Sequence, residues 1–298
     1  LSNRKACKLA GLSRTSHQYK SKPKDDSELQ DALTALTTRH VAIGYWQCCY
    51  RLWNKGYNWN HKRIYRVYTD MKLNIRRRSK KRLPERVKQA LSVPDAPNQV
   101  WSIDFMSDRL LDGRKFRLLN VIDDYNRESL AIEVDTSLPS MRVIRVLEKL
   151  AAQRGLPANI RCDNGPEFIS HKLEQWCSDQ SRQITLQFIQ PGKPMQNAYI
   201  ERKNGSMRRE LLDAYLFNSL AEVRMLSEEW RKDYNIDRPH KSLGYQSPLQ
   251  YAKIHIRKSA LSTAASETLK QIEAQPLVDN AADKEKNFTF ENSNNKWH

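Results

Sequence analysis

The sequence predicts an α/β fold in which a mixed β-sheet carries helices on both faces and is preceded by a helical region. Two observations predict it. Up to about residue 97 the hydrophobic residues recur with helical spacing. From residue 98 onward, three short strand-like segments follow one another and then alternate with helices. Such an order favours a sheet with both antiparallel and parallel neighbours.

The first twenty residues predict two short helices. Gly11 separates them, and Ser13 is a plausible N-cap for the second, which gives the outline of a small helix-turn-helix. An amphipathic helix is expected from about residue 27 to 39, with three leucines on one side.

A second helical pair follows, with one helix over residues 45–53 and another that begins after Asn60 as its cap. Basic residues on the second helix of such a pair commonly face DNA. The candidate DNA contacts on this helix are Lys62, Arg63 and Arg66. The aromatic residues nearby are interpreted as core.

Five strands and three helices are expected beyond residue 98. The strands are 99–106, 116–123, 128–134, 159–162 and 185–189, the first joined to the second through 107–115. The helices are 139–154, 170–182 and a longer one from about 196. Together these segments predict four parts: a helix-turn-helix region 1–83, a proline-marked linker 84–97, an α/β core with a C-terminal helix 98–253, and a disordered tail 254–298.

Composition restricts the class of protein. Hydrophobic residues make up 39% of the 298 and aromatic residues 9%, which is typical of a folded chain. No apolar run reaches membrane-spanning length, so no membrane association is expected. Five cysteines without a C-x-x-C pair indicate reduced thiols in a cytosol, and hence a cytoplasmic protein. Cys48 and Cys49 are adjacent and lack zinc-ligand spacing, so core packing is the better interpretation than a zinc site.

Basic charge is concentrated at the start of the chain. The net charge is +17, and residues 1–97 hold 22 Lys and Arg against 7 Asp and Glu, a net +15. This concentration favours a polyanionic partner, because phosphate contacts release condensed counterions. An RNA binder and a merely solvated face are the alternatives. The run 76–82, which includes Arg76, Arg77 and Arg78, is either a phosphate contact or a plain solvated linker.

Three acidic residues stand at positions from which they could meet. Strand alternation places Asp104 on the face opposite Trp101 and Ile103, where an acid is costly unless a metal ion or a hydrogen-bond network compensates it. Asp163 ends the strand 159–162 and precedes Asn-Gly, although the same composition forms ordinary turns. A polar stripe, which a solvated helix face would also show, follows on the next helix: Asn197, Glu201, Asn204 and Arg208.

Carboxylates on two strands and one helix are the ligands that two divalent cations share in phosphoryl transfer. Oxygen-rich sites of this kind favour Mg²⁺ or Mn²⁺ over zinc. Asp123 and Asp124 are interpreted as turn residues with a possible outer role, and Glu167 as a residue that orients the loop after Asp163.

Five motifs resemble, in this order, the integrase-core transposases of bacterial insertion sequences, specifically the insertion-sequence-three family. They are "WSIDFM", "LLNVIDDYNRESLAIEV", "RCDNGPEFIS", "QPGKPMQNAYIERKNGSMRREL" and "YNIDRPHKSLGYQSP", and the similarity covers roughly residues 1–253. The resemblance implies a ribonuclease-H-like, retroviral-integrase-like core whose acidic triad is Asp104, Asp163 and Glu201. It also implies that Arg208, seven residues after the glutamate, contacts element-end DNA.

Further roles are assigned beside the triad. Lys203 and Asn204 are additional candidate DNA contacts, and the supporting residues are Asn164, Gly165 and Asn197. The chain departs from the family in two places. Its 37 residues between the second and third acid slightly exceed the usual spacing, a loop insertion that the site can absorb. Lys203 also replaces the aromatic residue that is usual there.

The predicted function is that of a DNA transposase, which cuts a strand at the element end and transfers the freed 3′-hydroxyl into DNA. A homo-oligomer assembled on DNA is expected. Because the family is often translated as a frameshift fusion, a start at Leu1 without methionine suggests an upstream-frame partner. The alternatives are a structure-specific nuclease of the same fold and a catalytically inactive DNA-binding relic. Arg238, His240 and Lys241 either touch phosphate or pack at a helix entry.

Overall fold

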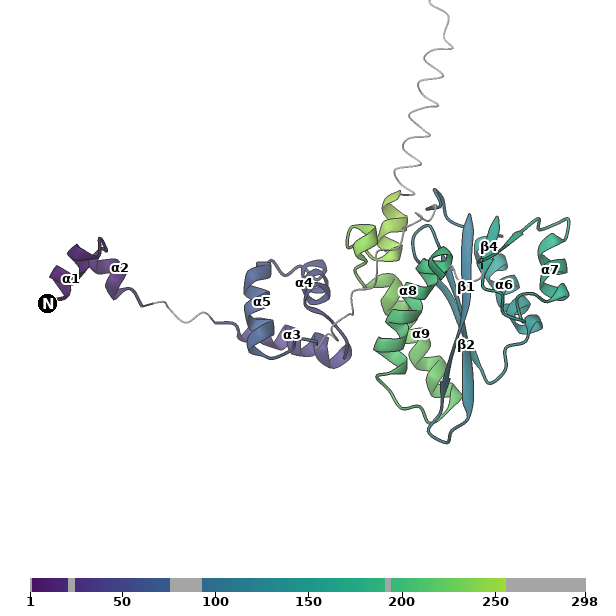
Figure 1. Ribbon diagram of the computed structural model, residues 1–298, viewed down its shortest axis with the longest axis horizontal. Coiled ribbons are helices and arrows are strands. Elements are labelled where there is room, and N and C mark those ends of the chain that lie inside the picture. Colours follow the sequence, from purple (N-terminus) through teal and green to yellow (C-terminus); the bar gives the residue numbers. More distant parts are fainter. Residues whose placement is uncertain (1, 21–24, 76–92, 191–193, 256–298) are drawn as a thin grey trace, which may run out of the picture. The chain divides into compact units, whose positions relative to one another are not determined.

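The structure is a computed structural model that describes residues 2–20, 25–75, 93–190 and 194–255 (Figure 1). Residues 1–252 form one compact unit. The predicted basic run 76–82 lies outside the described residues, as does the predicted tail apart from residues 254 and 255, which are helical. The predicted domain boundaries therefore stay predictions.

Helices α1 (Asn3–Leu9) and α2 (Arg14–Gln18) open the chain. Ser13 caps α2, because its Oγ accepts a hydrogen bond from the backbone N–H of Ser16 at 3.0 Å. Both helices match the prediction, including the position of the cap.

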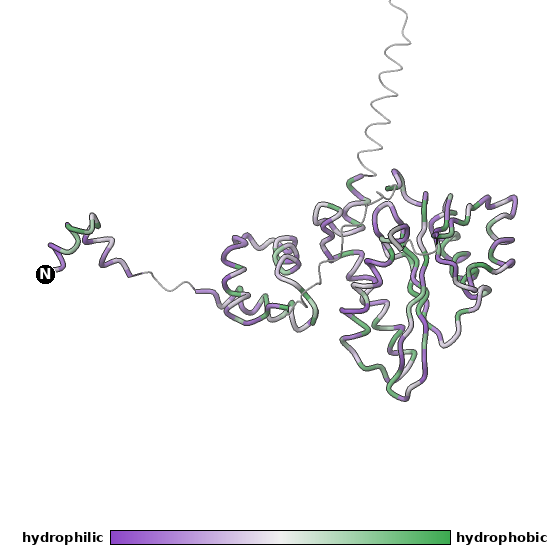
Figure 2. The backbone as a smooth tube through the Cα atoms, viewed as in Figure 1, coloured by the Kyte–Doolittle hydropathy of each residue, from purple (hydrophilic) through white to green (hydrophobic). Residues whose placement is uncertain are grey.

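Three further helices, α3 (Ser27–Arg39), α4 (Tyr45–Asn54) and α5 (His61–Asp70), pack around a common apolar core. Hydrophobic and hydrophilic positions alternate along them (Figure 2). The core residues are Leu29, Leu33, Leu36, Ile43, Cys48, Cys49, Leu52, Ile64, Val67 and Tyr68. The predicted cap Asn60 accepts a hydrogen bond from the Lys62 N–H at 2.8 Å. Cys48 and Cys49 are thus core residues.

A five-stranded mixed sheet forms the centre of the α/β part (Figure 1). Its strands are β1 (Val100–Arg109), β2 (Lys115–Asp123), β3 (Ser129–Asp135), β4 (Asn159–Cys162) and β5 (Thr185–Phe188). The order is β3-β2-β1-β4-β5, with β1, β2 and β3 antiparallel and β4 parallel to both β1 and β5. The predicted mixed sheet is confirmed.

Helices cover both faces of the sheet. Helices α6 (Ser140–Arg154) and α7 (His171–Ser178) share an apolar cluster with one face, which includes Trp101, Ile103 and Val121. The other face packs Met106 and Phe116 against α8 (Ala198–Met207), the π-helical turn η2 (Arg208–Leu212) and α9 (Leu220–Ile236). The alternation along β1 therefore sends Asp104 toward the α8 side.

Three element boundaries differ from the prediction by more than one residue. Strand β1 continues to Arg109, because its ladder with β2 extends to the pair Arg109 and Lys115, which shortens the predicted 107–115 connection. Helix α7 ends at Ser178 rather than near residue 182, because the Asp179 side chain accepts hydrogen bonds from Ser181 and forms a turn. The helix expected from residue 196 begins with the 3₁₀ turn η1 (Pro194–Asn197).

None of the described helices combines the length and the apolar content that crossing a bilayer requires.

Candidate active site

Asp104 lies in the middle of β1, directly opposite Asn120 of β2. Its Oδ1 accepts a hydrogen bond from the Phe105 N–H at 2.8 Å, and its Oδ2 accepts one from Asn204 Nδ2 at 2.7 Å. Burial raises the pKa of Asp104 to about 6, and the negative charges of Asp163 and Glu201 act in the same direction against these two donors. A cation at this place would favour the ionised form.

Asp163 follows β4 directly, at the carboxyl end of a strand parallel to β1. Its Oδ1 accepts a hydrogen bond from the Gly165 N–H at 3.0 Å, and Asn164 Nδ2 donates to the Ile189 carbonyl at 3.1 Å. A Cβ on Gly165 would come within 3.0 Å of Asp163 Oδ1. Glycine at this position therefore lets the turn approach the carboxylate closely.

Glu201 lies in the first turn of α8 and is exposed. Partial burial nevertheless raises its pKa. Asn197 precedes the helix, is 3% exposed, and its Oδ1 has no hydrogen-bond partner within the described part of the chain.

The three carboxylates share a lack of counter-ions. No ion pair among the described residues involves Asp104, Asp163 or Glu201, whereas four other acids of the core each contact an arginine and the buried Asp123 accepts from backbone N–H groups instead. These ion pairs are Asp124 with Arg161, Glu128 with Arg154, Glu167 with Arg117, and Glu210 with Arg238. The unpaired set is thus the part of the core that would gain most from a bound cation.

The donor set fits a hard divalent cation, because it consists of carboxylate oxygens alone. Across the described ranges, however, no three Asp, Glu, His or Cys side chains lie close enough to surround a single ion. The triad is electrostatically coupled through Asp104 but is not a closed cluster. Glu201 is the exposed member, so a change of its rotamer costs little.

Lys203 was predicted to contact DNA, but its side chain is buried between α8 and the sheet. Its side chain is 1% exposed, and its Nζ donates to Asn120 Oδ1 at 2.9 Å. Burial holds the pKa of Lys203 well below its usual range. Its position two residues after Glu201 turns it under α8, toward the sheet, so it offers no surface charge to a phosphate.

Asn204 is also buried and joins Lys203 to Asp104 through a chain of hydrogen bonds. Asn120 Nδ2 donates to Asn204 Oδ1 at 2.8 Å, and Asn204 Nδ2 donates to Asp104. The Asp104 carboxylate can only accept hydrogen bonds, and Lys203 Nζ donates one at the other end of the chain. Asn120 and Asn204 are therefore both oriented with the amide oxygen toward Lys203 and the amide nitrogen toward Asp104. Sequence reasoning missed Asn120, although a polar residue inside the apolar run 116–123 was a signal for it.

Three of the remaining candidate DNA contacts, Arg63, Arg66 and Arg208, form ion pairs. Arg208 donates to Asp108 Oδ2 and to the Ser107 carbonyl, both at 2.8 Å. Arg63 and Arg66 both donate to Asp26, at 2.7 and 2.6 Å. The Arg208 pair is partly exposed and therefore weak, so a phosphate can replace its carboxylate, whereas the Asp26 side chain is only 8% exposed and is held by two arginines.

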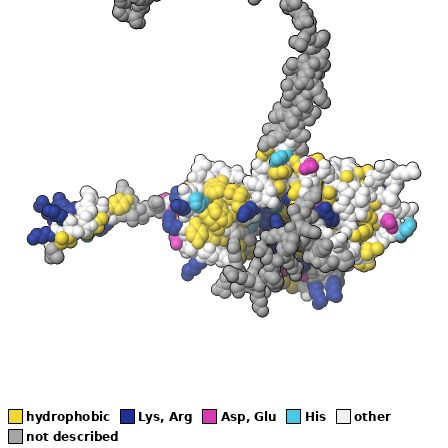
Figure 3. Space-filling model, turned by 45° about the horizontal axis from the view of Figure 1, so that its top comes forward, with side chains coloured by type: hydrophobic (Ala, Val, Ile, Leu, Met, Phe, Trp, Pro, Cys, Tyr) yellow, Lys and Arg dark blue, Asp and Glu magenta, His cyan; other side chains and the backbone are white. Residues whose placement is uncertain are grey.

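Lys62 is exposed and has no ion pair among the described residues. Arg76, Arg77 and Arg78 lie outside the described residues. Lys and Arg side chains also gather over α1 on the face seen in Figure 3. DNA contacts by all these residues stay predictions.

Asp123 and Asp124, interpreted above as turn residues, are fully buried. Asp123 accepts hydrogen bonds from the backbone N–H groups of Asn98 and Tyr125, both at 2.9 Å, which anchors the start of β1 to the end of β2. Asp124 accepts from Arg161 Nη1 at 2.7 Å. Both acids therefore hold the fold beneath the site.

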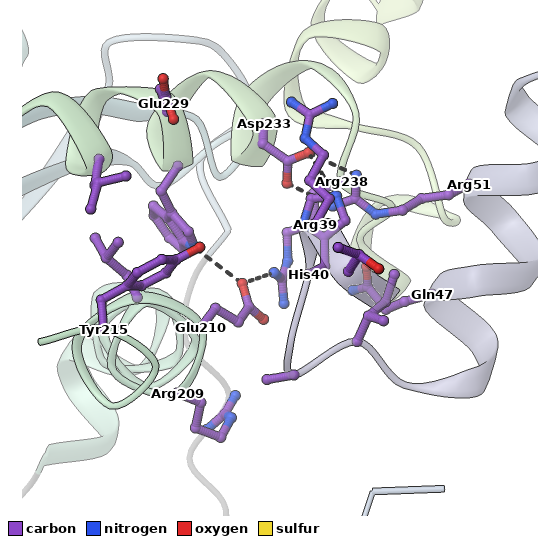
Figure 4. A pocket seen from close by; sticks show the side chains of 16 residues that line it. Arg39, His40, Gln47, Arg51, Arg209, Glu210, Tyr215, Glu229, Asp233 and Arg238 are labelled. Carbon is purple, nitrogen blue, oxygen red and sulfur yellow. Dashed lines mark hydrogen bonds and ion pairs between the residues drawn. The ribbon is translucent and has the colours of Figure 1, made fainter. Parts of the chain in front are cut away.

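A cavity of about 380 Å³ contains several charged side chains that already have partners (Figure 4). Asp233 accepts two hydrogen bonds from Arg51, at 2.8 and 2.6 Å. Glu210 accepts from Trp230 Nε1 and from Arg238. None of the three candidate catalytic carboxylates lines this cavity.

Comparison with known proteins decides the family. The Integrase core domain family matches two segments of the chain, residues 94–194 and residues 182–248. The chain is 42% identical over 270 residues to the "Insertion element IS407 uncharacterized 31.7 kDa protein" of Burkholderia multivorans, covering 90% of this chain and 96% of that relative. This chain belongs to the integrase-core transposase family of bacterial insertion elements.

A second relative of this transposase is the "Insertion element IS476 uncharacterized 39.2 kDa protein" of Xanthomonas euvesicatoria. It is 40% identical over 253 residues, which are 85% of this chain and 72% of the relative. The HTLV-2 integrase catalytic core domain is a more distant structural likeness, with 19% identity and a TM-score of 0.42 over 52% of this chain and 97% of that chain. The family assignment does not depend on it.

Proposed function

We propose that Asp104, Asp163 and Glu201 are the catalytic carboxylates of this DNA transposase and that together they hold two Mg²⁺ or Mn²⁺ ions. The observation that supports this most is their lack of counter-ions in a core where four other acids, Asp124, Glu128, Glu167 and Glu210, are paired with arginines. Their mutual influence on the pKa of Asp104 supports their action as one group.

When bound, the ions would activate the attacking oxygen and stabilise the leaving oxygen of an in-line displacement at phosphorus. Asp104 would be the fixed member, because the Phe105 N–H and the Asn204 amide each hold one of its oxygens. Asp163 would be held by its turn with Gly165. Glu201, carried by α8, would complete the ligand set.

Two displacements would follow at this site. In the first, water attacks a phosphodiester at the element end and the 3′-hydroxyl of the cut strand leaves. In the second, that 3′-hydroxyl attacks a phosphodiester of target DNA, and a target 3′-hydroxyl leaves. Neither step needs a covalent bond to the protein, so the side chains position and stabilise charge but do not act as nucleophiles.

The substrates are accordingly element ends and target DNA, bound by a homo-oligomer that assembles on them. Because the substrate is bacterial DNA, we place the protein with the nucleoid in the cytoplasm. A fusion with an upstream-frame protein stays a prediction.

The test is a Mg²⁺-dependent cleavage and joining assay on DNA that carries the parent element's ends. Wild type is expected to give cleaved and joined strands, whereas Asp163→Asn and Glu201→Gln are expected to give neither while they retain DNA binding. Glu174→Gln, at an exposed position in α7, is the matched control and should behave as wild type. Joined products from Glu201→Gln would overturn the assignment, and cleavage without joining in wild type would indicate a nuclease.

A further inference from the structure

A second cavity, of about 170 Å³, lies between the β2–β3 turn, α8 and the segment after α9. The liquid volume of a water molecule is about 30 Å³, so the cavity has room for roughly five such groups, about the size of a phosphate. The residues on which the argument depends are Arg127, Tyr199, Arg202, Arg238, His240 and Lys241. None of the proposed catalytic carboxylates lines this cavity.

Arg127 is the buried cation of this cavity. Its side chain is 8% exposed, and its guanidinium carbon lies 3.3 Å from the centre of the Tyr199 ring. Its Nε and Nη1 have no hydrogen-bond partner among the described residues. Asp124 attracts this charge; its Oδ2 accepts from Arg161, and its Oδ1 is likewise buried without a hydrogen-bond partner among the described residues. Buried donors of this kind normally have an acceptor, so Arg127 is a lining residue with two donor nitrogens that lack one within the described residues.

The backbone at Arg127 is also unusual. Its φ is 62°, a left-handed conformation that few non-glycine residues adopt and that an arginine side chain does not favour. Such conformations are ordinary in hairpin turns and also occur at functional sites, where the surrounding structure fixes them. Here the turn brings the guanidinium under Tyr199 of α8.

The lining of the cavity carries an excess of positive charge. Arg202 and Lys241 are exposed, and within the described part of the chain neither makes an ion pair. Arg238 is paired with Glu210, which does not line the cavity. No acidic residue lines it among the described residues, in contrast to the 380 Å³ cavity, where acidic side chains take part in the lining.

His240 adds no charge near neutral pH. Burial and the nearby Arg238 lower its pKa to about 3, so the ring stays neutral and contacts the Tyr234 carbonyl at 3.2 Å. The positive charge of the cavity therefore comes from Arg127, Arg202 and Lys241, one buried and two at the surface.

We propose that this cavity binds a phosphate of the DNA backbone. A guanidinium presents parallel N–H donors that match phosphate oxygens, and the Lys241 ammonium adds a point charge. Arg202 follows Glu201 on α8, so the cavity shares this helix with one of the proposed catalytic carboxylates. The inference rests on the chain acting on DNA and not on which carboxylates hold the metal ions.

The experiment compares two double variants of the full chain. Arg202→Met with Lys241→Met removes the two exposed cations of the cavity, whereas Arg145→Met with Lys172→Met removes two exposed cations from α6 and α7, on the other face of the sheet. Binding is measured without divalent metal, as a function of salt, on a duplex with the element end and on an unrelated duplex. Each phosphate contact contributes about 0.9 to the slope of log affinity against log salt.

The cavity variant is expected to lower this slope by about one relative to the control variant, equally on both duplexes, because phosphate contacts carry no sequence information. A slope and an affinity equal to those of the control would overturn the proposal. Protection of wild type by inorganic phosphate against thermal unfolding, lost in the cavity variant while its DNA slope is unchanged, would assign the cavity to a free anion and overturn it too.

This outcome is separable from the catalytic assignment. If Glu201→Gln kept strand-joining activity while the cavity variant lowered the salt slope, the carboxylate roles would be wrong and the phosphate cavity would stand. If Glu201→Gln were inactive and the slope unchanged, only the cavity proposal would fail.

Discussion

Two sets of carboxylates occupy the α/β core, and they differ in what faces them. Asp124, Glu128 and Glu167 each contact an arginine. Asp104, Asp163 and Glu201 have no such partner among the described residues. Burial raises the pKa of Asp104 to about 6, and it raises the pKa of Asp124 to about 6 as well in spite of its arginine, so the two sets differ in their counter-ions and not in this pKa. Removing one member of a buried pair leaves a charge uncompensated. The paired acids should therefore act on stability, and the unpaired acids on catalysis.

The largest expected effect is a loss of catalytic activity when one of the unpaired carboxylates is replaced. Asp104→Asn should lower strand cleavage and joining by at least about 10²-fold to 10³-fold, the usual loss when one preorganised charged group is removed from a site. Its thermal unfolding temperature should not fall, because an unpaired buried charge is removed. Gel assays of products beside a thermal melt measure both. A destabilised Asp104→Asn protein would contradict the comparison.

The second expected effect is a loss of stability, when a paired acid loses its arginine. Arg161→Met leaves Asp124 buried without its partner, since Asp124 is 0% exposed. The free energy of unfolding should fall by about 3–5 kcal/mol, measured by urea titration at neutral pH. Arg145→Met, at an exposed position in α6, is the control and should change little. Equal stability of the two variants would show that the pair is dispensable.

A third effect concerns pH in the absence of metal. The folded-state pKa of Asp104 is about 6, above the ordinary 3.8, so the folded chain takes up the proton first. The ionised form therefore costs stability above pH 6, and this cost is relieved as the pH falls from 6 toward 4. Asp104→Asn should exceed wild type in stability at pH 8, by about 3 kcal/mol at most, and the difference should disappear near pH 4. Urea titrations with a chelator at several pH values measure it; a difference independent of pH would contradict the raised pKa.

The smallest expected effect concerns the buried hydrogen-bond chain from Lys203 through Asn120 and Asn204 to Asp104. Lys203→Met removes the donor that orients Asn120 and, through Asn204, the amide that holds Asp104. Groups that orient metal-binding side chains typically contribute about 10-fold to 100-fold to activity or metal affinity. We expect a higher half-saturating Mg²⁺ concentration in the joining assay. The free energy of unfolding should fall by about 1–3 kcal/mol, because the buried Asn120 Oδ1 loses its donor.

Two comparisons distinguish this orienting role from simple packing. Lys172→Met, on the exposed side of α7, should keep the wild-type Mg²⁺ dependence. An arginine side chain also only donates hydrogen bonds. Lys203→Arg should therefore recover part of the metal affinity, provided that the guanidinium fits the space under α8. An unchanged half-saturation in Lys203→Met would exclude the orienting role.

Local sequence determined much of this protein. Caps, helical spacing and strand alternation located α3 at its observed ends, the caps Ser13 and Asn60, and all five strands, because these features depend on residues near in sequence. The order of the elements predicted the mixed sheet, and the sequence motifs by themselves indicated the family. Asp104 stood out in the same way, because an acid inside an apolar strand is a local anomaly, whereas Asp163 and Glu201 were predicted from a turn, a polar helix stripe and the family resemblance.

Tertiary structure alone decided which polar groups meet. Lys203 was expected to contact DNA, but the rotation of α8 against the sheet buries it, and that rotation depends on apolar contacts far away in sequence. Asn120 acquired its role from the register of β1 with β2. The arginine partners of the core acids lie between 26 and 50 residues away, as with Glu128 and Arg154 or Arg117 and Glu167. No local pattern encodes such pairs, because they form only when the sheet and its helices bring distant segments together.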